Sequence, residues 1–280
     1  MKLKLFVTLL MAAMMIPTMG QSKFVVVKDG HFEKDGQPYY YVGTNFWYGA
    51  ILGSEGQGGD RQRLCRELNL MKQIGIDNLR ILVGSDGERG VTTKVEPTLQ
   101  VAPGVYNDTI LAGLDYLMQE LGKRQMVAVL YLNNSWEWSG GYGFYLQHAG
   151  AGKAPRPNED GYPAYMNFVA QYATNQQAHQ LFYDYVRFIL SRTNRYTGVA
   201  YKDDPAIMSW QIGNEPRAFS KEALPAFEQW LSEASALIRK LDPNHLISIG
   251  SEGAWGCEGD YGCWERICAD QNIDYCNIHL

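Results

Sequence analysis

This 280-residue sequence has few long apolar runs, fewer basic than acidic residues and only five cysteines. Apart from one run near the N-terminus, no stretch is long and apolar enough to suggest a membrane span. Lys and Arg number 25 against 30 Asp and Glu, so the charge indicates neither a nucleic acid nor an anionic surface as partner. Neither a linker nor a repeat of about 20–50 residues occurs. We therefore expect one domain, residues 21–280.

The first 20 residues have the pattern of a secretory signal peptide. Lys2 and Lys4 precede an apolar run at 5–16, and Gly20 is a small residue near the expected cut. The alternative is a single membrane anchor, but the run is too short to span a bilayer comfortably. Without residues 1–20, which hold two lysines and no acid, the chain has 23 basic and 30 acidic residues, a net charge of −7. We expect a secreted or periplasmic protein that is not membrane-bound after cleavage.

Four of the five cysteines lie close together near the C-terminus: Cys257, Cys263, Cys268 and Cys276. Export makes disulfides plausible, and four cysteines allow three pairings among which the sequence does not choose. No Cys-x-x-Cys spacing occurs, and His279, three residues past Cys276, has no matching partner, so we expect no zinc site. Cys65 lies on the apolar face of a predicted helix, where a free buried thiol is the usual case.

Short apolar segments alternate along the chain with amphipathic helical patterns, which predicts an α/β fold with a parallel sheet closed by crossovers. The expected architecture is a (β/α)8 TIM barrel. Long loops use up much of the chain, and only six strand–helix units are present, so we expect an incomplete barrel that stops after strand six. The six predicted strands are at 39–43, 77–83, 126–132, 206–212, 246–250 and 275–279.

The candidate catalytic residues lie in the stretch Ser-Trp-Gln-Ile-Gly-Asn-Glu-Pro-Arg at 209–217. Asn214 and Glu215 stand where the predicted strand 206–212 gives way to a loop, and Pro216 cannot continue the ladder. In barrels of this kind, catalytic side chains sit at this end of the strands. The alternative is an ordinary surface turn. A carboxylate beside an amide that can hold a sugar hydroxyl suits cleavage of a glycosidic bond.

With Arg80, Asn214-Glu215-Pro216-Arg217 and Asn277-Ile278-His279 in place, the sequence resembles glycoside hydrolase family 5, within the clan of retaining (β/α)8 glycosidases. It is most similar to the endo-β-1,4-mannanase branch, and the resemblance covers nearly all of 23–280. Arg217 and the run Gly-Ser-Glu-Gly at 250–253 favour a mannanase over a β-1,4-glucanase of the cellulase type, which remains the alternative. Further mannanase-like stretches are at 43–48, 133–136 and 139–141.

The resemblance implies a role for each matching residue. Glu215 would be the general acid/base, and Asn214 would bond the 2-hydroxyl of the attacked sugar. Arg80 would hold the nucleophilic carboxylate as an anion, unless it is a plain surface charge. His279 would shape the cleft. Further implied substrate contacts, each aromatic among them as readily a packing residue, are Trp47, Tyr48, Trp136, Trp138, Arg217, Glu252 and Trp255.

One departure from the family pattern concerns the second carboxylate. The family's nucleophile is a Glu at the end of strand seven, and this chain stops at Leu280 before that position. The resemblance implies that the whole enzyme acts on a mannan-type polysaccharide as its partner and uses no metal and no cofactor. We expect no activity from the chain as written. The alternative from another class is a non-catalytic, truncated product that binds mannan weakly or not at all. The oligomeric state is not indicated.

Overall fold

The computed structural model describes residues 23–91 and 93–279. The predicted signal peptide at 1–20 lies outside these residues. Within the described part of the chain, none of the helices combines the length and the apolar character that crossing a membrane requires.

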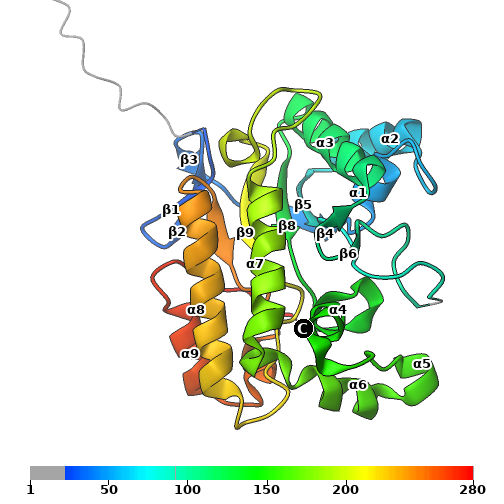
Figure 1. Ribbon diagram of the computed structural model, residues 1–280. Coiled ribbons are helices and arrows are strands. Elements are labelled where there is room, and N and C mark those ends of the chain that lie inside the picture. Colours follow the sequence, from blue (N-terminus) through cyan, green and yellow to red (C-terminus); the bar gives the residue numbers. More distant parts are fainter. Residues whose placement is uncertain (1–22, 92, 280) are drawn as a thin grey trace, which may run out of the picture.

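Five parallel strands form the main sheet, in the order β10-β9-β8-β5-β4, so that neighbours in the sheet are also successive along the chain. Long helices connect them and pack on the outer face (Figure 1). This is the arrangement of an incomplete (β/α)8 barrel, as predicted. The strands are β4 (Val42–Asn45), β5 (Ile76–Leu82), β8 (Val127–Tyr131), β9 (Ile207–Gln211) and β10 (Leu246–Ser248).

The helices on the outer face are amphipathic, and their apolar sides build the larger core. Leu79, Ile81 and Leu130 point from the sheet into this core, where Leu114 and Phe182 of two covering helices meet them. The main helices are α2 (Arg61–Gln73), α3 (Asp108–Lys123), α7 (Gln176–Leu190), α8 (Leu224–Leu241) and α9 (Tyr261–Cys268).

A small sheet covers the N-terminal ends of the strands. It consists of β1 (Val26–Lys28), β2 (His31–Lys34) and β3 (Gln37–Pro38), all antiparallel. The flanking side chains of Val25 and Tyr39 pack against Val127, Met208 and Leu246, which begin three barrel strands or lie near their starts. The interior of the barrel is therefore apolar at this end, and polar side chains are left for the other end.

Long loops after β5 and β8 carry short elements of their own (Figure 1). They extend the C-terminal face of the sheet, where sites in this architecture lie. The elements of the loops are β6 (Gln100–Ala102), β7 (Val105–Tyr106), α4 (Gly141–Leu146), α5 (Pro157–Asp160) and α6 (Tyr162–Val169), with single turns at Glu137–Ser139, Gln147–Ala151 and Tyr172–Thr174. Elsewhere lie α1 (Gly49–Leu52) and turns at Tyr201–Asp203 and Gly253–Cys257.

The sixth predicted strand, 275–279, is wrong as secondary structure. The segment runs beside β10, but the backbone bond between them is a single one, from the Asp274 amide to the Ile247 carbonyl at 2.9 Å. Side chains replace the rest of the ladder: the Asp274 carboxylate accepts from the Ile247 amide, and the Asn277 amide oxygen accepts from Gly250. Because the Asp274 side chain takes a backbone donor of β10 and Asn277 takes that of Gly250 just after it, the segment lies along the sheet without joining it.

The cysteines resolve into one disulfide and three free thiols. Cys268 at the end of α9 is bonded to Cys276, which fastens the last described segment to the helix. Cys257 and Cys263 are free and buried, while Cys65 is free and only half-buried. The disulfide belongs to one of the three pairings that the sequence left open, but the other two cysteines of that pairing, Cys257 and Cys263, are not bonded to each other.

Candidate active site

The loop that carries Asn214 and Glu215 is bonded to the ends of both neighbouring strands. The Asn214 amide donates to the Asn133 carbonyl after β8, and the Glu215 amide donates to the Gly250 carbonyl after β10, both at 2.8 Å. A Cβ on Gly250 would lie 1.8 Å from the Gly213 carbonyl oxygen, so only glycine allows this close approach. The position of Glu215 is therefore set by three parallel strands at once.

Glu215 itself has a left-handed backbone conformation, with φ of 52°, which is uncommon for a residue with a side chain. The buried Ser135 hydroxyl stabilises this conformation, because it donates to the Glu215 carbonyl at 2.6 Å and accepts from the Arg217 amide at 3.1 Å. Backbone strain of this kind persists only where surrounding contacts fix it, and it is concentrated at functional sites.

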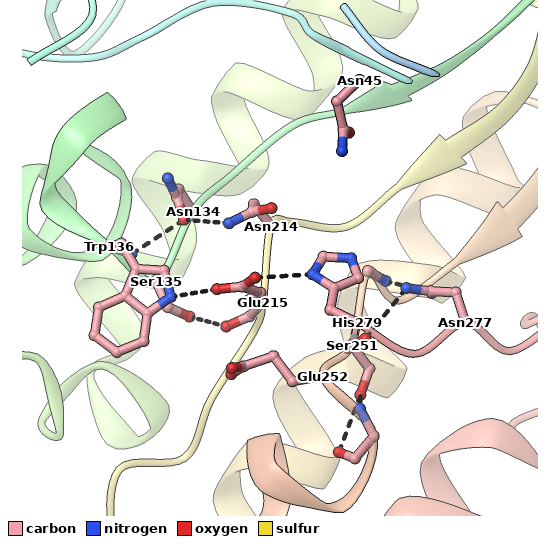
Figure 2. Close-up of polar contacts among 12 residues, drawn as sticks. Asn45, Asn134, Ser135, Trp136, Asn214, Glu215, Ser251, Glu252, Asn277 and His279 are labelled. Atoms are coloured by element: carbon pink, nitrogen blue, oxygen red, sulfur yellow. Dashed lines mark hydrogen bonds and ion pairs between the residues drawn. The ribbon is translucent and has the colours of Figure 1, made fainter. Parts of the chain in front are cut away.

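The Glu215 carboxylate is held between an indole and an imidazole (Figure 2). Trp136 Nε1 donates to one oxygen at 2.6 Å, and His279 Nδ1 lies 2.8 Å from the other. The bond to His279 lowers the pKa of Glu215 most; the Trp136 bond and the nearby charge of Arg80 lower it further, against the opposing effect of partial burial. Within these residues, Glu215 therefore favours its ionised form.

Arg80 points from β5 into the barrel toward the same end. Its guanidinium donates to Gln211 at 2.7 Å and to Asn214 at 3.0 Å, and it lies 4.3 Å from the ring centre of Tyr131. A longer contact of 3.4 Å reaches Asn45. Burial lowers the Arg80 pKa, and among the described residues no carboxylate comes within ion-pair distance of it. A largely desolvated cation bonded only to neutral amides is well placed to receive an anion.

A hollow of about 320 Å³ opens between Arg80 and His279, with Asn45 and Asn277 on its walls. It lies inside the curve of the sheet, between the first barrel strand and the segment beside β10. The unpaired guanidinium thus faces open space rather than packed side chains.

The second carboxylate near Glu215 is already engaged. Glu252 binds the Arg217 guanidinium with both oxygens, at 3.0 Å and 2.9 Å. Burial raises the Glu252 pKa, Arg217 opposes this, and the charge of Glu215 adds to the rise. Arg217 also lies over the Trp136 ring, 5.3 Å from its centre, so this pair extends the cleft wall next to the acid.

The structure thus brings together Glu215, Asn214, Arg80, His279, Trp136, Arg217 and Glu252. The other predicted aromatics differ. The Tyr48 hydroxyl donates to Glu67 on α2, and its ring packs against the core, which favours a packing role. Trp47 touches the Tyr48 ring edge-on and is 42% exposed. Among the described residues, no ring contact or hydrogen bond joins Trp138 or Trp255 to Glu215; Trp255 is 73% exposed. Substrate contacts by these four stay predictions.

Four residues of the cluster were not selected from the sequence as site residues. Asn45 is the last residue of β4 and Asn134 follows the end of β8, and a position at a strand end was a usable signal. Gln211 and Ser135 had no such signal, because Gln211 looks like an ordinary strand residue and Ser135 like a loop residue.

Within residues 23–91 and 93–279, no three His, Cys, Asp or Glu side chains are grouped closely enough to hold a metal ion.

A carboxylate lies at the C-terminal edge of the parallel barrel, beside amide side chains that can hydrogen-bond sugar hydroxyls. This arrangement is typical of barrel proteins with a hydrolase-like site. The family model described as glycoside hydrolase family 5 beta-mannosidase-like matches residues 22–280. The chain belongs to this family.

Relatives and solved structures agree with that assignment. A putative mannan endo-1,4-beta-mannosidase 9 of Oryza sativa is 32% identical over 84% of this chain and 52% of its own length, and mannan endo-1,4-beta-mannosidase 1 of Solanum lycopersicum is 28% identical over 84% and 54%. The glycoside hydrolase family 5 mannosidase of Rhizomucor miehei is 34% identical, with a TM-score of 0.83, over 93% of this chain and 62% of its own. The chain spans about half the length of the curated relatives it matches.

Proposed function

We propose that this chain is the acid/base-bearing part of a secreted endo-β-1,4-mannanase that acts by a retaining double displacement. The observation that carries the proposal is the placement of Glu215: it lies in the loop after β9, Trp136 and His279 orient its carboxylate, and Arg80, which has no acidic partner among the described residues, faces the adjacent hollow. The names of the plant relatives, mannan endo-1,4-beta-mannosidases, support the choice of substrate. Export rests on the signal pattern at 1–20.

A second carboxylate is required, and we propose that it binds beside Arg80 in the hollow. Retaining glycosidases need two carboxylates about 5–5.5 Å apart. Glu252 is occupied by Arg217, and Arg80 has no acidic partner among the described residues. The second carboxylate would therefore come from outside residues 23–91 and 93–279. In the Rhizomucor miehei mannosidase, two further structures carry single glutamate-to-alanine changes at different positions, which fits a two-glutamate site.

The proposed reaction has two steps, and each bond that forms is matched by one that breaks. First, the second carboxylate attacks the anomeric carbon, the glycosidic C–O bond breaks, and Glu215 gives its proton to the departing oxygen. Then Glu215 takes a proton from water, whose oxygen bonds to the anomeric carbon and displaces the carboxylate. Asn214 is placed by Arg80 and Asn134, and we propose that it bonds the 2-hydroxyl in both transition states.

The contacts of Glu215 in the described residues lower its pKa, whereas the scheme needs a protonated acid. The second carboxylate would raise this pKa. A general acid must carry a proton at the start, whereas His279, Trp136 and Arg80 favour the anion. A second negative charge beside Arg80 would neutralise the guanidinium and repel the Glu215 charge, and both effects raise its pKa. The acid is thus expected to become competent only in the completed site.

A second candidate is release of single mannose units from a chain end. It is favoured by one observation: the structures named mannosidase superpose with TM-scores of 0.83–0.84, and the Rhizomucor miehei endo-1,4-beta-mannanase with 0.73. A β-1,4-glucanase of the same family is the remaining alternative.

The experiment uses a completed chimera, in which residues 21–279 are followed by the remaining barrel of the Rhizomucor miehei mannosidase. We expect release of reducing ends from β-1,4-mannan, a rapid fall in viscosity and a range of oligosaccharides, with little release from carboxymethyl-cellulose. Mannose as the sole early product would favour the chain-end activity. Faster release from carboxymethyl-cellulose than from mannan would overturn the choice of substrate.

A further inference from the structure

Two buried free thiols lie close together where the turn at Gly253–Cys257 meets α9. Cys257 ends that turn, and Cys263 lies in the first turn of the helix; their exposed fractions are 2% and 0%. Asp260 joins them, because its amide donates to the Cys257 carbonyl at 2.8 Å and its carboxylate accepts from the Cys263 amide at 2.9 Å. The reaction proposed above uses neither thiol.

The two thiols are in contact with each other. Burial raises the pKa of Cys257 to about 11, and a hydrogen bond from the Cys263 thiol opposes the rise. Burial and the contact with Cys257 raise the pKa of Cys263 in turn. Glu228 of α8 faces the same pair, and Arg266 donates to its carboxylate at 2.9 Å. Two thiols in contact can be bridged without a large movement of the backbone.

A bond between these sulfurs would form while the chain folds. The thiolate is the form that attacks a disulfide, and the raised pKa values keep both thiols protonated in the folded molecule. During folding, one thiolate attacks an oxidant that is itself a disulfide, such as oxidised glutathione, and releases half of it as a thiol. The second thiolate then displaces the other half, so that one disulfide forms, one is reduced, and both protons end on the released thiols.

The turn that ends at Cys257 packs against the loop after β9. The Gly256 carbonyl accepts from the Ala218 amide at 3.0 Å. A Cβ on Gly256 would lie 2.6 Å from the Pro216 carbonyl oxygen, so the two backbones approach closely. Since Pro216 directly follows Glu215, a covalent bond at Cys257 would also hold the loop that carries the acid.

The opposite end of α9 is already fastened to a neighbouring segment. Cys268 at the end of the helix is bonded to Cys276, and the segment that continues from there carries His279, which contacts Glu215. A bond at the start of the helix would therefore give α9 a covalent link at both ends. Each link would hold one of two segments that approach Glu215.

From these contacts we propose that Cys257 and Cys263 form a second disulfide in the exported protein. The supply of oxidant rests on the proposed function, because export belongs to it. The pairing itself rests on the contact between two enclosed thiols and on their common partner, Asp260. The role of the bond is to hold the loops beside Glu215 in place, and it takes no part in cleavage of the substrate.

The test refolds the reduced 280-residue chain in a mixture of reduced and oxidised glutathione, so that it needs no export. Free thiols are then alkylated under denaturing conditions, and peptide mass spectrometry assigns the links. We expect a bond between Cys257 and Cys263 beside the one between Cys268 and Cys276, with alkylation at Cys65 alone. Free thiols at Cys257 and Cys263, or a bond from either to another cysteine, would overturn the inference.

A stability measurement separates a covalent link from packing of two thiols. Cys257→Ser in the oxidised protein is expected to lower Tm by about 4–8 °C, the effect of opening a short loop in a domain of this size. Cys65→Ser, outside both bonds, is the matched control and should change Tm far less. After full reduction, the difference between the unchanged chain and Cys257→Ser should largely disappear, and a difference that persists in full would contradict the inference.

Activity is measured separately, in the completed chimera. Mannan hydrolysis by a chimera in which Cys257 and Cys263 stay free after oxidative refolding would overturn this inference alone. Formation of the bond without hydrolysis would overturn only the proposed activity.

Discussion

No reducing ends are expected from β-1,4-mannan when the purified 280-residue chain is assayed alone. Retaining cleavage needs two carboxylates about 5–5.5 Å apart, one of them free to attack carbon. In the described residues, Glu215 is bonded by Trp136 and His279, and both oxygens of Glu252 are bonded by Arg217. Arg80, the cation that faces the hollow beside Glu215, has amide partners alone among the described residues.

The assay is read together with near-UV circular dichroism, so that a folded but inactive chain is separated from an unfolded one. The completed chimera serves as the positive control on the same substrate. Measurable endo-cleavage by the folded chain would contradict the account, because a nucleophile would then lie within it. Loss of that activity in a Glu252→Gln variant would identify Glu252 as the residue responsible.

Replacement of Glu215 by Gln in the completed chimera is expected to lower kcat/KM on mannan by about 10²–10⁴-fold, the contribution usual for general acid–base catalysis. The amide keeps the size of the side chain and its capacity to accept from Trp136, so binding should change little. The loss would then fall on kcat. Glu265→Gln is the matched control, because Glu265 is exposed on α9, and this variant should retain full activity.

Two signatures separate an acid/base role from a merely structural one. Aryl mannosides with good leaving groups need little protonation, so Glu215→Gln should slow their first cleavage step far less than that of mannan. The chimera should also lose kcat/KM as pH rises through the pKa of the acid, and this limb should disappear in the variant. Since the second carboxylate raises the Glu215 pKa, the limb should lie above the pKa that NMR titration gives Glu215 in the 280-residue chain. An unchanged rate on mannan would contradict the assignment.

The three central strands and the position of Glu215 could be predicted because both depend on local pattern. Buried β-branched runs identify β5, β8 and β9 within a residue or two of their observed bounds. The asparagine and glutamate after β9 stand at the strand end that barrel chemistry uses. Arg80 was also identifiable, because a charge inside an apolar strand is rare without a purpose.

Contacts between distant segments could not be predicted in the same way. The 275–279 segment is apolar enough for a strand, but the side chains of Asp274 and Asn277 bond Ile247 of β10 and Gly250 after it, in place of backbone bonds. Tyr48 follows a strand end as a binding residue would, yet Glu67 lies within reach of its hydroxyl. The Ser135 bond to Glu215 spans 80 residues, so no local pattern indicates it.

The central claim is that Glu215 works with a second carboxylate, held by Arg80, that lies outside the described residues. Incubation of the completed chimera with a 2-deoxy-2-fluoro-mannosyl fluoride should trap the covalent intermediate, and peptide mass spectrometry should identify the labelled residue. The account predicts one label, on a glutamate of the added barrel segment, and much weaker labelling after Arg80→Ala. A label on Glu252, on Glu215 or on any other residue of 23–279 would contradict it.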